Sequence, residues 1–405
     1  MFLTDEEKRI LDGEKGVGCQ KAMELIYALA LTFDAEKLIP IKRAHCALSG
    51  QEGDTYWCEL LVNNGAKCTV PVTTNPYWDT CYLTKFFDVT KDELELAERT
   101  GDVYRRIGAK LTYHCAPGLG TNVPFFGEHI AFSESSATPY VNSVLGARSN
   151  RESSVSALAA GVIGKTPLYG YHLDENRYGE FLIDIDAEME DHYDWGILGH
   201  CVGKIAGSRN AVLRFKDPVN PGPEDFLYFG AEAATSGAVA MYHMVGVTPE
   251  ARTIEQAFGN RPIPKSEAVL TNKDLKDREE LLTPNGGEIN LVMLGCPHYT
   301  YNQLLDVERL LGGRKVNQNV AFWILAEFQA VELAERSHLR QRLELLGVRM
   351  VGDTCIDEPC WKSFEGRLGV TDSPKCAYYR ERRGQSFAVR RLSECVEAAI
   401  SGRVE

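Results

Sequence analysis

Hydrophobic positions recur at two spacings along the chain, and segments with the two spacings alternate. Ala22, Leu25, Ile26, Leu29 and Phe33 repeat at the spacing of an amphipathic helix. Short apolar or alternating runs between such helices are typical of strands. We predict strands at residues 38–41, 67–72, 111–113 and 182–187, and helices at residues 56–63, 93–107 and 231–241. This β and α order predicts an α/β fold with a mostly parallel sheet.

The clearest pattern lies towards the end of the chain. Buried strands and helices alternate there at residues 289–294, 302–311, 320–325, 330–346 and 348–351. A βαβαβ order predicts a doubly wound parallel sheet, and ligands bind at the carboxyl ends of the strands in such sheets. Cys296 and Cys355 follow the first and third of these strands, so we expect both thiols at that edge.

These patterns divide the chain into three parts. We expect an N-terminal α/β catalytic region of two subdomains over residues 1–285, and a doubly wound domain over residues 286–375. Residues 376–405 are expected to pack back on the core. Residues 115–151 are rich in Gly, Ser and Asn, which indicates a functional loop with a short helix. The polar residues 252–287 contain three prolines and indicate a domain boundary or a surface excursion.

Composition narrows the classes of function. The chain has 405 residues, of which 44% are hydrophobic, enough for a large core. Its net charge of −13 disfavours nucleic acid or an anionic membrane as the main partner. The acidic start lacks the apolar core of a secretion signal, and no apolar run is long enough to span a bilayer. We therefore expect a cytoplasmic protein whose twelve cysteines stay reduced.

Three single cysteines carry the candidate chemistry. Cys115, Cys296 and Cys355 each follow a predicted strand, and the absence of a Cys-x-x-Cys pair argues against a zinc ribbon or thioredoxin-type site. Three thiolates from distant strand ends can hold an iron–sulfur cluster and leave one iron open for substrate. The alternative is three unrelated buried or turn cysteines, as we expect for Cys19, Cys58, Cys68, Cys201 and Cys395.

The polar segment from Gly127 to Glu152 is the next candidate. It holds His129, Glu134 and Arg148 among several hydroxyl side chains. Arginine matches carboxylates with its planar fork, and Glu134 can transfer a proton if burial raises its pKa. The alternative is a helix cap with solvated polar residues.

Two shorter features point to an anionic ligand. Thr74, Asn75 and Pro76 follow a predicted strand and offer hydroxyl, amide and backbone donors, although an Asn-Pro turn explains them equally well. The segment from His45 to Gly50 has the same character. Lys375 can neutralise a substrate carboxylate, or it can be an ordinary solvated lysine.

Taken together, these segments resemble the aconitase X family, specifically the large subunit of its two-chain members. The resemblance covers essentially the whole chain, and the block from Glu134 to Arg151 is long enough to be specific. It implies an aconitase-like multi-domain architecture, with parallel doubly wound sheets around a central cleft. Its motifs include Thr73-Thr74-Asn75-Pro76, Cys115-Ala116-Pro117, Gly127-Glu128-His129, Glu134-Ser135-Ser136-Ala137, Gly295-Cys296-Pro297-His298 and Asp353-Thr354-Cys355.

The resemblance implies a dehydratase with an iron–sulfur cluster (4Fe-4S or 2Fe-2S) or a mononuclear iron on Cys115, Cys296 and Cys355. It implies substrate contacts from Ala47, Leu48, Ser49, Asn75, Pro76, Glu134, Ser135 and Lys375. With the motif chemistry, we assign catalysis to Glu134, Ser135 and His129, and we add Thr74 and Arg148 to the substrate-binding set. The family's small swivelling domain has no counterpart here, so we expect a separate small subunit in a heterodimer or heterotetramer.

The family dehydrates cis-3-hydroxy-L-proline or (R)-5-phosphomevalonate, and this sequence departs from the family pattern at four places. These are His114 for threonine, Ala47 for glycine, Phe328-Gln329 for Ser-Arg, and Asp372 beside Ser373-Pro374-Lys375. Losing an arginine weakens the case for a phosphate-bearing substrate. We therefore predict cis-3-hydroxy-L-proline, with phosphomevalonate or an unassigned hydroxy acid as alternatives. A non-catalytic iron or redox sensor that binds RNA and a zinc-stabilised structural subunit also stay open.

Overall fold

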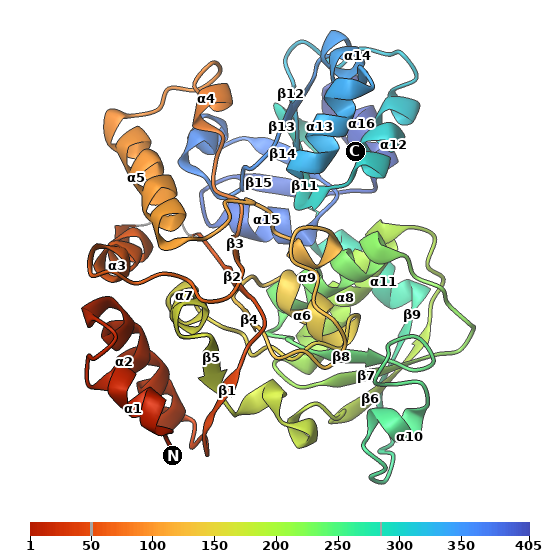
Figure 1. The fold of residues 1–405 in the computed structure, drawn as a ribbon. Helices are drawn as coiled ribbons and strands as arrows, with labels where there is room; N and C mark the ends of the chain where they lie inside the picture. Colours follow the sequence, from red (N-terminus) through yellow and green to blue (C-terminus); the bar gives the residue numbers. More distant parts are fainter. Residues whose placement is uncertain (49–51, 284–285) are drawn as a thin grey trace.

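Three parallel sheets organise the computed structural model, which describes residues 1–48, 52–283 and 286–405 (Figure 1). The sheets have three, four and five strands, and every strand pair within them is parallel. Helices separate the strands along the chain, as parallel connections require. The predicted α/β class with parallel sheets is therefore confirmed.

The first unit, drawn red to yellow in Figure 1, holds the three-stranded sheet in the order β3-β2-β4. Its strands are β1 (Leu38–Pro40), β2 (Ala44–Cys46), β3 (Val72–Thr74), β4 (Ala131–Phe132) and β5 (Lys165–Pro167). Its α-helices are α1 (Asp5–Leu11), α2 (Val17–Thr32), α3 (Glu52–Asn63), α4 (Thr80–Leu83), α5 (Lys91–Ile107), α6 (Ala137–Ser143) and α7 (Ser154–Ile163). Strands β1 and β5 pair separately, in antiparallel register.

Two strand predictions in this unit are wrong. The strand predicted at residues 67–72 begins only at Val72, and residues 111–113 form no strand. Tyr113 has a φ of 45°, which a strand cannot accommodate. The chain turns there, and the backbone N–H of His114 donates to the carbonyl of Thr74 at 3.0 Å. Cys115 therefore follows a turn that is fastened to the end of β3.

The second unit holds the four-stranded sheet, in the order β8-β7-β6-β9. Its elements are β6 (Phe181–Asp186), α8 (His192–Ala206), β7 (Ala211–Phe215), α9 (Pro223–Ser236), β8 (Tyr242–Met244), α10 (Ile254–Ala257), β9 (Ser266–Thr271) and α11 (Asn272–Leu281). The helix predicted at residues 231–241 ends earlier, at Ser236. Helices α8 and α9 pack tightly, because a Cβ at Gly199 would lie 2.3 Å from the carbonyl oxygen of Phe229.

Residues 252–287, expected to be a domain boundary or a surface excursion, contain a strand of the second sheet, so the excursion is wrong for residues 266–271. Strand β9 pairs in parallel with β6 and forms an edge of the second sheet. It escaped prediction because it is largely exposed and its apolar residues are consecutive and do not alternate with polar ones.

The third unit holds the five-stranded sheet in the order β13-β12-β11-β14-β15. Its elements are β11 (Leu291–Tyr299), α12 (Tyr301–Leu311), β12 (Ala321–Ala326), α13 (Phe328–Arg336), α14 (Leu339–Leu346), β13 (Val348–Val351), β14 (Leu368–Thr371), α15 (Pro374–Glu381), β15 (Ser386–Val389) and α16 (Leu392–Ser401). The single helix predicted at residues 330–346 is two helices, because His338 has a φ of 57°. Residues 376–405 contribute β15, which is the edge strand of this sheet, and helix α16.

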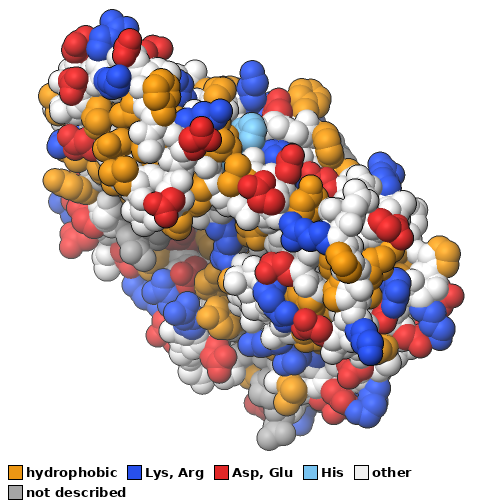
Figure 2. Space-filling view, turned by 90° about the horizontal axis from the view of Figure 1, so that it is seen from below, with side chains coloured by type: hydrophobic (Ala, Val, Ile, Leu, Met, Phe, Trp, Pro, Cys, Tyr) orange, Lys and Arg blue, Asp and Glu red, His pale blue; other side chains and the backbone are white. Residues whose placement is uncertain are grey.

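The first and third units share one hydrophobic core. Val72 and Leu83 of the first unit belong to the same buried cluster as Trp323 and Trp361 of the third. The two units therefore hold their loops in a fixed relation. On the face shown in Figure 2, Lys and Arg side chains are interspersed with Asp and Glu and form no basic patch. No helix in the described part of the chain is long and apolar enough to cross a membrane.

Candidate active site

A cavity of about 250 Å³ lies between loops of the first and third units. The predicted residues that line it are Cys115, Cys296, Cys355, Glu134, Ser135, Ala47, Leu48, Asn75, Pro76 and Lys375. A larger hollow of about 590 Å³ lies at the ends of β6 and β7 and contains none of the predicted site residues. The smaller cavity is therefore the candidate active site.

Parallel strands of the first unit deliver one side of this cavity. Ala47 and Leu48 follow β2, Asn75 follows β3, and Glu134 follows β4. All are at carboxyl ends of strands in one parallel sheet, which is where ligands bind in such folds. Ser49, predicted beside them, lies outside the described residues.

The third unit delivers the other side in the same way. Cys296 lies near the carboxyl end of β11, Cys355 follows β13, and Lys375 is in the first turn of α15, after β14. Gly295 has a φ of 97°, and a Cβ there would lie 1.9 Å from the carbonyl oxygen of Leu325. Only glycine lets β11 approach β12 this closely beside Cys296.

Backbone hydrogen bonds fasten the cysteine loops of the two units together. The N–H of Tyr77 donates to the carbonyl of Asp353 at 2.9 Å, and the N–H of Cys355 donates to the carbonyl of Tyr77 at 3.0 Å. The N–H of His298 donates to the Sγ of Cys115 at 3.2 Å. Thiols far apart in sequence are thus held at one cavity by rigid backbone.

The three thiols are protonated in the absence of a bound cation. Burial raises the pKa of Cys115 to about 12, and it raises the pKa values of Cys296 and Cys355 well above their ordinary range. Backbone N–H groups aim at two of the sulfurs, from His298 to Cys115 and from Asp357 to Cys355, at 3.2 and 3.5 Å. A cation is needed to stabilise thiolates in this setting. In the described part of the chain, no group of three His, Cys, Asp or Glu side chains is arranged so that it could hold a metal ion.

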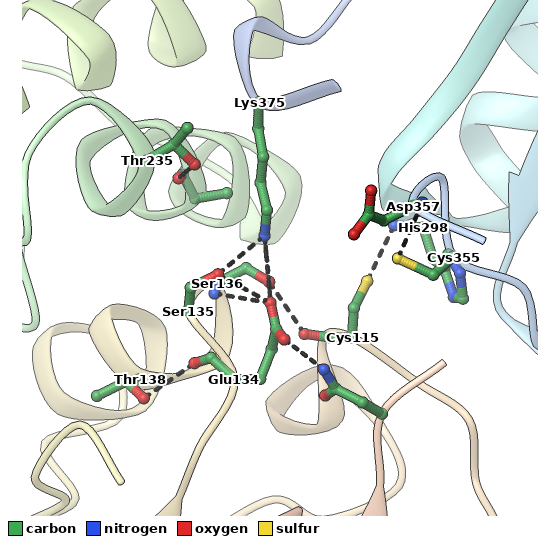
Figure 3. A network of polar contacts seen from close by, with 12 residues as sticks. Cys115, Glu134, Ser135, Ser136, Thr138, Thr235, His298, Cys355, Asp357 and Lys375 are labelled. Atoms are coloured by element: carbon green, nitrogen blue, oxygen red, sulfur yellow. Dashed lines mark hydrogen bonds and ion pairs between the residues drawn. The ribbon is translucent and has the colours of Figure 1, made fainter. Parts of the chain in front are cut away.

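A buried ion pair occupies the opposite part of the cavity (Figure 3). The Nζ of Lys375 lies 3.2 Å from the Oε1 of Glu134 and 3.2 Å from the Oγ of Ser135. Ser135 and Ser136 donate to the same Oε1 through their hydroxyls, at 3.1 and 2.9 Å. The side-chain amide of Asn75 donates to the other oxygen, Oε2. Four side chains thus hold one carboxylate in a fixed orientation.

This network lowers the pKa of Glu134, whereas we expected burial to raise it. Burial by itself raises that pKa, but Lys375, Asn75 and Ser136 together lower it to about 2. Burial lowers the pKa of Lys375, but Glu134, together with smaller contributions from Cys296, Tyr379 and Cys115, raises it well above the usual range. The expectation of a raised pKa for Glu134 is therefore wrong, and the pair is fully ionised near neutral pH.

The cavity also contains residues that were not predicted as site residues. His298, Thr354, Asp357 and Tyr379 all line it. Two of them had a usable signal: His298 is two residues after Cys296, and Tyr379 is one helical turn after Lys375. Thr354 is part of the motif Asp353-Thr354-Cys355, and Asp357 is two residues after Cys355, where no motif marked it.

His114, one of the departures from the family pattern, lies behind the cysteines and outside the cavity. It is buried, and its Nε2 lies 2.9 Å from the Oε2 of Glu327, which follows β12. Its ring stacks on that of His298, with centroids 6.2 Å apart. The pair of His114 and Glu327 thus ties the residue before Cys115 to the carboxyl end of β12 in the third sheet.

Three predicted residues do not reach the cavity. His129 and Arg148 belong to a separate polar cluster, where the Nδ1 of His129 lies 2.9 Å from the Nδ1 of His172 and Arg148 pairs with Asp174. His129 precedes β4 whereas Glu134 follows it, so the strand carries them to opposite ends. Thr74 lies within β3 and hydrogen-bonds only to backbone and Thr112. We therefore remove all three from the proposed site.

Family comparison agrees with this division into units. The models of the aconitase X first, second and third domains match residues 1–175, 179–280 and 289–401. The crystal structure of Thermococcus kodakaraensis aconitase X (holo-form) is similar, with a TM-score of 0.87 and 32% identity, covering 98% of this chain and 100% of that one. The chain belongs to the aconitase X family, as its motifs predicted, and its fold is aconitase-like.

Curated relatives fall into two groups, and both are dehydratases. The phosphomevalonate dehydratase large subunit of Thermococcus kodakarensis is 37% identical over 398 residues, covering 96% of this chain and 97% of the relative. The cis-3-hydroxy-L-proline dehydratase of Pseudomonas aeruginosa is 32% identical over 406 residues, covering 98% of this chain and 70% of the relative. This chain is accordingly a hydro-lyase, and an RNA-binding sensor or a structural zinc subunit finds no support among these relatives.

Proposed function

We propose that this chain is the large subunit of a dehydratase that removes water from a small hydroxy carboxylic acid. One observation carries the proposal: three thiols and a buried carboxylate–ammonium pair line the same cavity. Elimination of water needs a group that draws off the hydroxyl and a base that accepts a proton beside the carboxylate. The cavity offers residues for both tasks.

Cys115, Cys296 and Cys355 are the proposed ligands of an iron–sulfur cluster. Thiols are the donor set that such clusters require, and two of the sulfurs receive backbone N–H groups. The wall beside them includes the buried Nδ1 of His298, which has no partner in the described part of the chain. A mononuclear iron on the same three thiols is the alternative. When bound, this group supplies a Lewis acid for the departing hydroxyl.

Lys375 and Glu134 are the proposed substrate-binding cation and general base. A substrate carboxylate that reaches Lys375 competes with Glu134 for the ammonium. Since Lys375 is the main group that lowers the pKa of Glu134, this competition raises the pKa of the buried carboxylate. Glu134 then accepts the substrate proton at Oε2, where Asn75 is the one hydrogen-bond donor among the described residues. Ser135 stays hydrogen-bonded to the other oxygen and keeps the carboxylate oriented.

The charges of the cavity favour cis-3-hydroxy-L-proline as the substrate. Lys375 is the one Lys or Arg among the described residues that line it, and Glu134 and Asp357 already contribute two carboxylates. A single substrate carboxylate suits one cation, whereas a phosphate brings up to two further negative charges.

A second candidate substrate is (R)-5-phosphomevalonate. It is favoured by how much of each relative's length this chain covers. This chain covers 97% of the phosphomevalonate dehydratase large subunit, but only 70% of the Pseudomonas hydroxyproline enzyme. An unassigned hydroxy acid remains the third option.

We also propose a separate small subunit. The relatives of matching length are named large subunits, whereas the cis-3-hydroxy-L-proline dehydratases extend well beyond the matched region. The expected partner is a swivelling domain that closes over the cavity and excludes water.

The proposal is tested by co-expressing this chain with its small subunit and reconstituting the complex with iron and sulfide without oxygen. The complex is then given cis-3-hydroxy-L-proline, (R)-5-phosphomevalonate and a panel of other hydroxy acids. We expect turnover of the hydroxyproline, which a Glu134→Gln variant lacks. A complex that binds iron but dehydrates none of these acids contradicts the proposal.

A further inference from the structure

Tyr379 is a cavity residue with no role so far. It lies on α15 one helical turn after Lys375, and both side chains line the cavity. The hydroxyl of Ser373 accepts the N–H of Cys376 at 3.1 Å and caps this helix, so the first turn is fixed. Lys375 is only 6% exposed, and Tyr379 is half-buried beside it.

The hydroxyl of Tyr379 has no hydrogen-bond partner in the described part of the chain. Most other polar side chains of the cavity are already engaged, the exception being the Nδ1 of His298 on the cysteine side. Their partners are Ser135 and Asn75 for the Glu134–Lys375 pair, Gly352 for Thr354, and Arg383 for Asp357. Tyr379 is thus a donor that the protein itself leaves free beside the cation.

The surroundings keep this phenol in its donor form. The charge of Lys375 lowers the pKa of Tyr379, but burial and the negative charge of Glu134 outweigh it and leave the pKa raised. A phenol that stays protonated donates its hydrogen and does not act as a base.

We propose that Tyr379 is a substrate-binding residue that donates a hydrogen bond to the same substrate carboxylate that Lys375 neutralises. A carboxylate has two oxygens, and two donors one helical turn apart can each serve one of them. The assignment rests on the proposed dehydratase function and deepens it, because it makes a free carboxylate, rather than an amide or ester, the group that the cavity selects.

The neighbouring residue provides a matched control. Tyr378 is 45% exposed, does not line the cavity, and packs edge-on against the Tyr379 ring at 5.5 Å between centroids. Tyr378→Phe therefore removes the same hydroxyl from the same helix without touching the cavity. Both variants are made in the complete, iron-loaded two-chain complex, and thermal unfolding verifies that each folds like the wild type.

Two measurements follow on these complexes. The first is kcat and KM for whichever hydroxy acid the wild-type complex turns over. The second is calorimetric binding of L-proline and of L-prolinamide, which differ only in the carboxylate. We expect Tyr379→Phe to lower kcat/KM by about ten- to hundredfold, mainly through KM, and to weaken L-proline binding by about tenfold. L-prolinamide binding and the Tyr378→Phe variant should stay within about twofold of wild type.

The outcomes separate this assignment from the function on which it rests. An active wild-type complex with an equally active Tyr379→Phe variant overturns the assignment alone. Equal weakening of L-proline and L-prolinamide also overturns it, because the hydroxyl then does not recognise the carboxylate. A wild-type complex that turns over no hydroxy acid overturns the dehydratase proposal, and the assignment falls with it.

Discussion

Replacing Lys375 with methionine isolates the electrostatics of the cavity. Methionine has a similar length but no charge, so the buried carboxylate of Glu134 loses its counter-ion. In the wild type, burial opposes ionisation of Glu134 and Lys375 is the largest of the groups that restore it. In the variant the hydrogen bonds from Asn75, Ser135 and Ser136 remain to oppose the effect of burial.

The structure sets the size of the effect. The pKa of Glu134 is about 2 against an ordinary value of 4.5, which corresponds to about 3 kcal/mol in favour of the ionised form. Because the folded-state pKa is the lower one, this contribution stabilises the fold above pH 4.5 and is lost as the pH falls towards 2. Removing one member of a buried pair typically costs about 3–5 kcal/mol, a similar amount. We therefore expect Lys375→Met to raise the pKa of Glu134 by about two units or more.

Infrared difference titration measures this pKa directly. The absorption of the protonated Glu134 carboxyl is assigned by comparison with a Lys375→Met/Glu134→Gln double variant. Lys165→Met is the matched control, because it removes the cation from another buried carboxylate, Glu7, in the first unit. The control should leave Glu134 titrating near pH 2. If Glu134 still titrates near pH 2 in Lys375→Met, the ion pair does not set its charge, and the reasoning fails.

Three further predictions concern the frame around the cavity. His114→Gln and Glu327→Gln should each lower the amount of iron bound per chain. The double variant should lose no more iron than either single variant, because both changes remove the same contact. Additive losses contradict the pairing. Gly295→Ala should lower the free energy of unfolding by several kcal/mol, because the added Cβ meets the backbone of β12. Gly313→Ala, at a glycine that also has a positive φ but open space around it, should lower it by about 1 kcal/mol. Equal denaturation midpoints for the two variants contradict this. The chain without its small subunit should bind iron but show no turnover, and full activity of the isolated chain argues against the partner.

Sequence patterns located the first three strands of the third unit because they are buried on both faces, whereas β14 and β15 were not predicted. Strand β11 is apolar over most of its length, and the predicted bounds of β13 agree with the structure. The strands of the first unit have only two or three residues, which is too short for any period to emerge. Its helices were therefore placed better than its sheet.

The sequence identified most residues of the site but not the contacts between them. The motifs marked Cys115, Glu134 and Lys375, and all three line the cavity. The pKa of Glu134 was misjudged because its counter-ion lies 241 residues away, a contact that only the packed units create. His129 was suggested by the many polar residues in its segment. It lies at the opposite end of β4 from Glu134.

The central claim is that three distant thiols hold one iron-containing group in this cavity, and metal analysis of anaerobically purified protein tests it most directly. The Cys115→Ser, Cys296→Ser and Cys355→Ser variants are compared with Cys395→Ser, which changes a buried thiol of α16 outside the cavity. The account predicts that the wild type and Cys395→Ser carry iron, and that each of the other variants loses most of it. Zinc in place of iron, or full iron content in all three cavity variants, contradicts it.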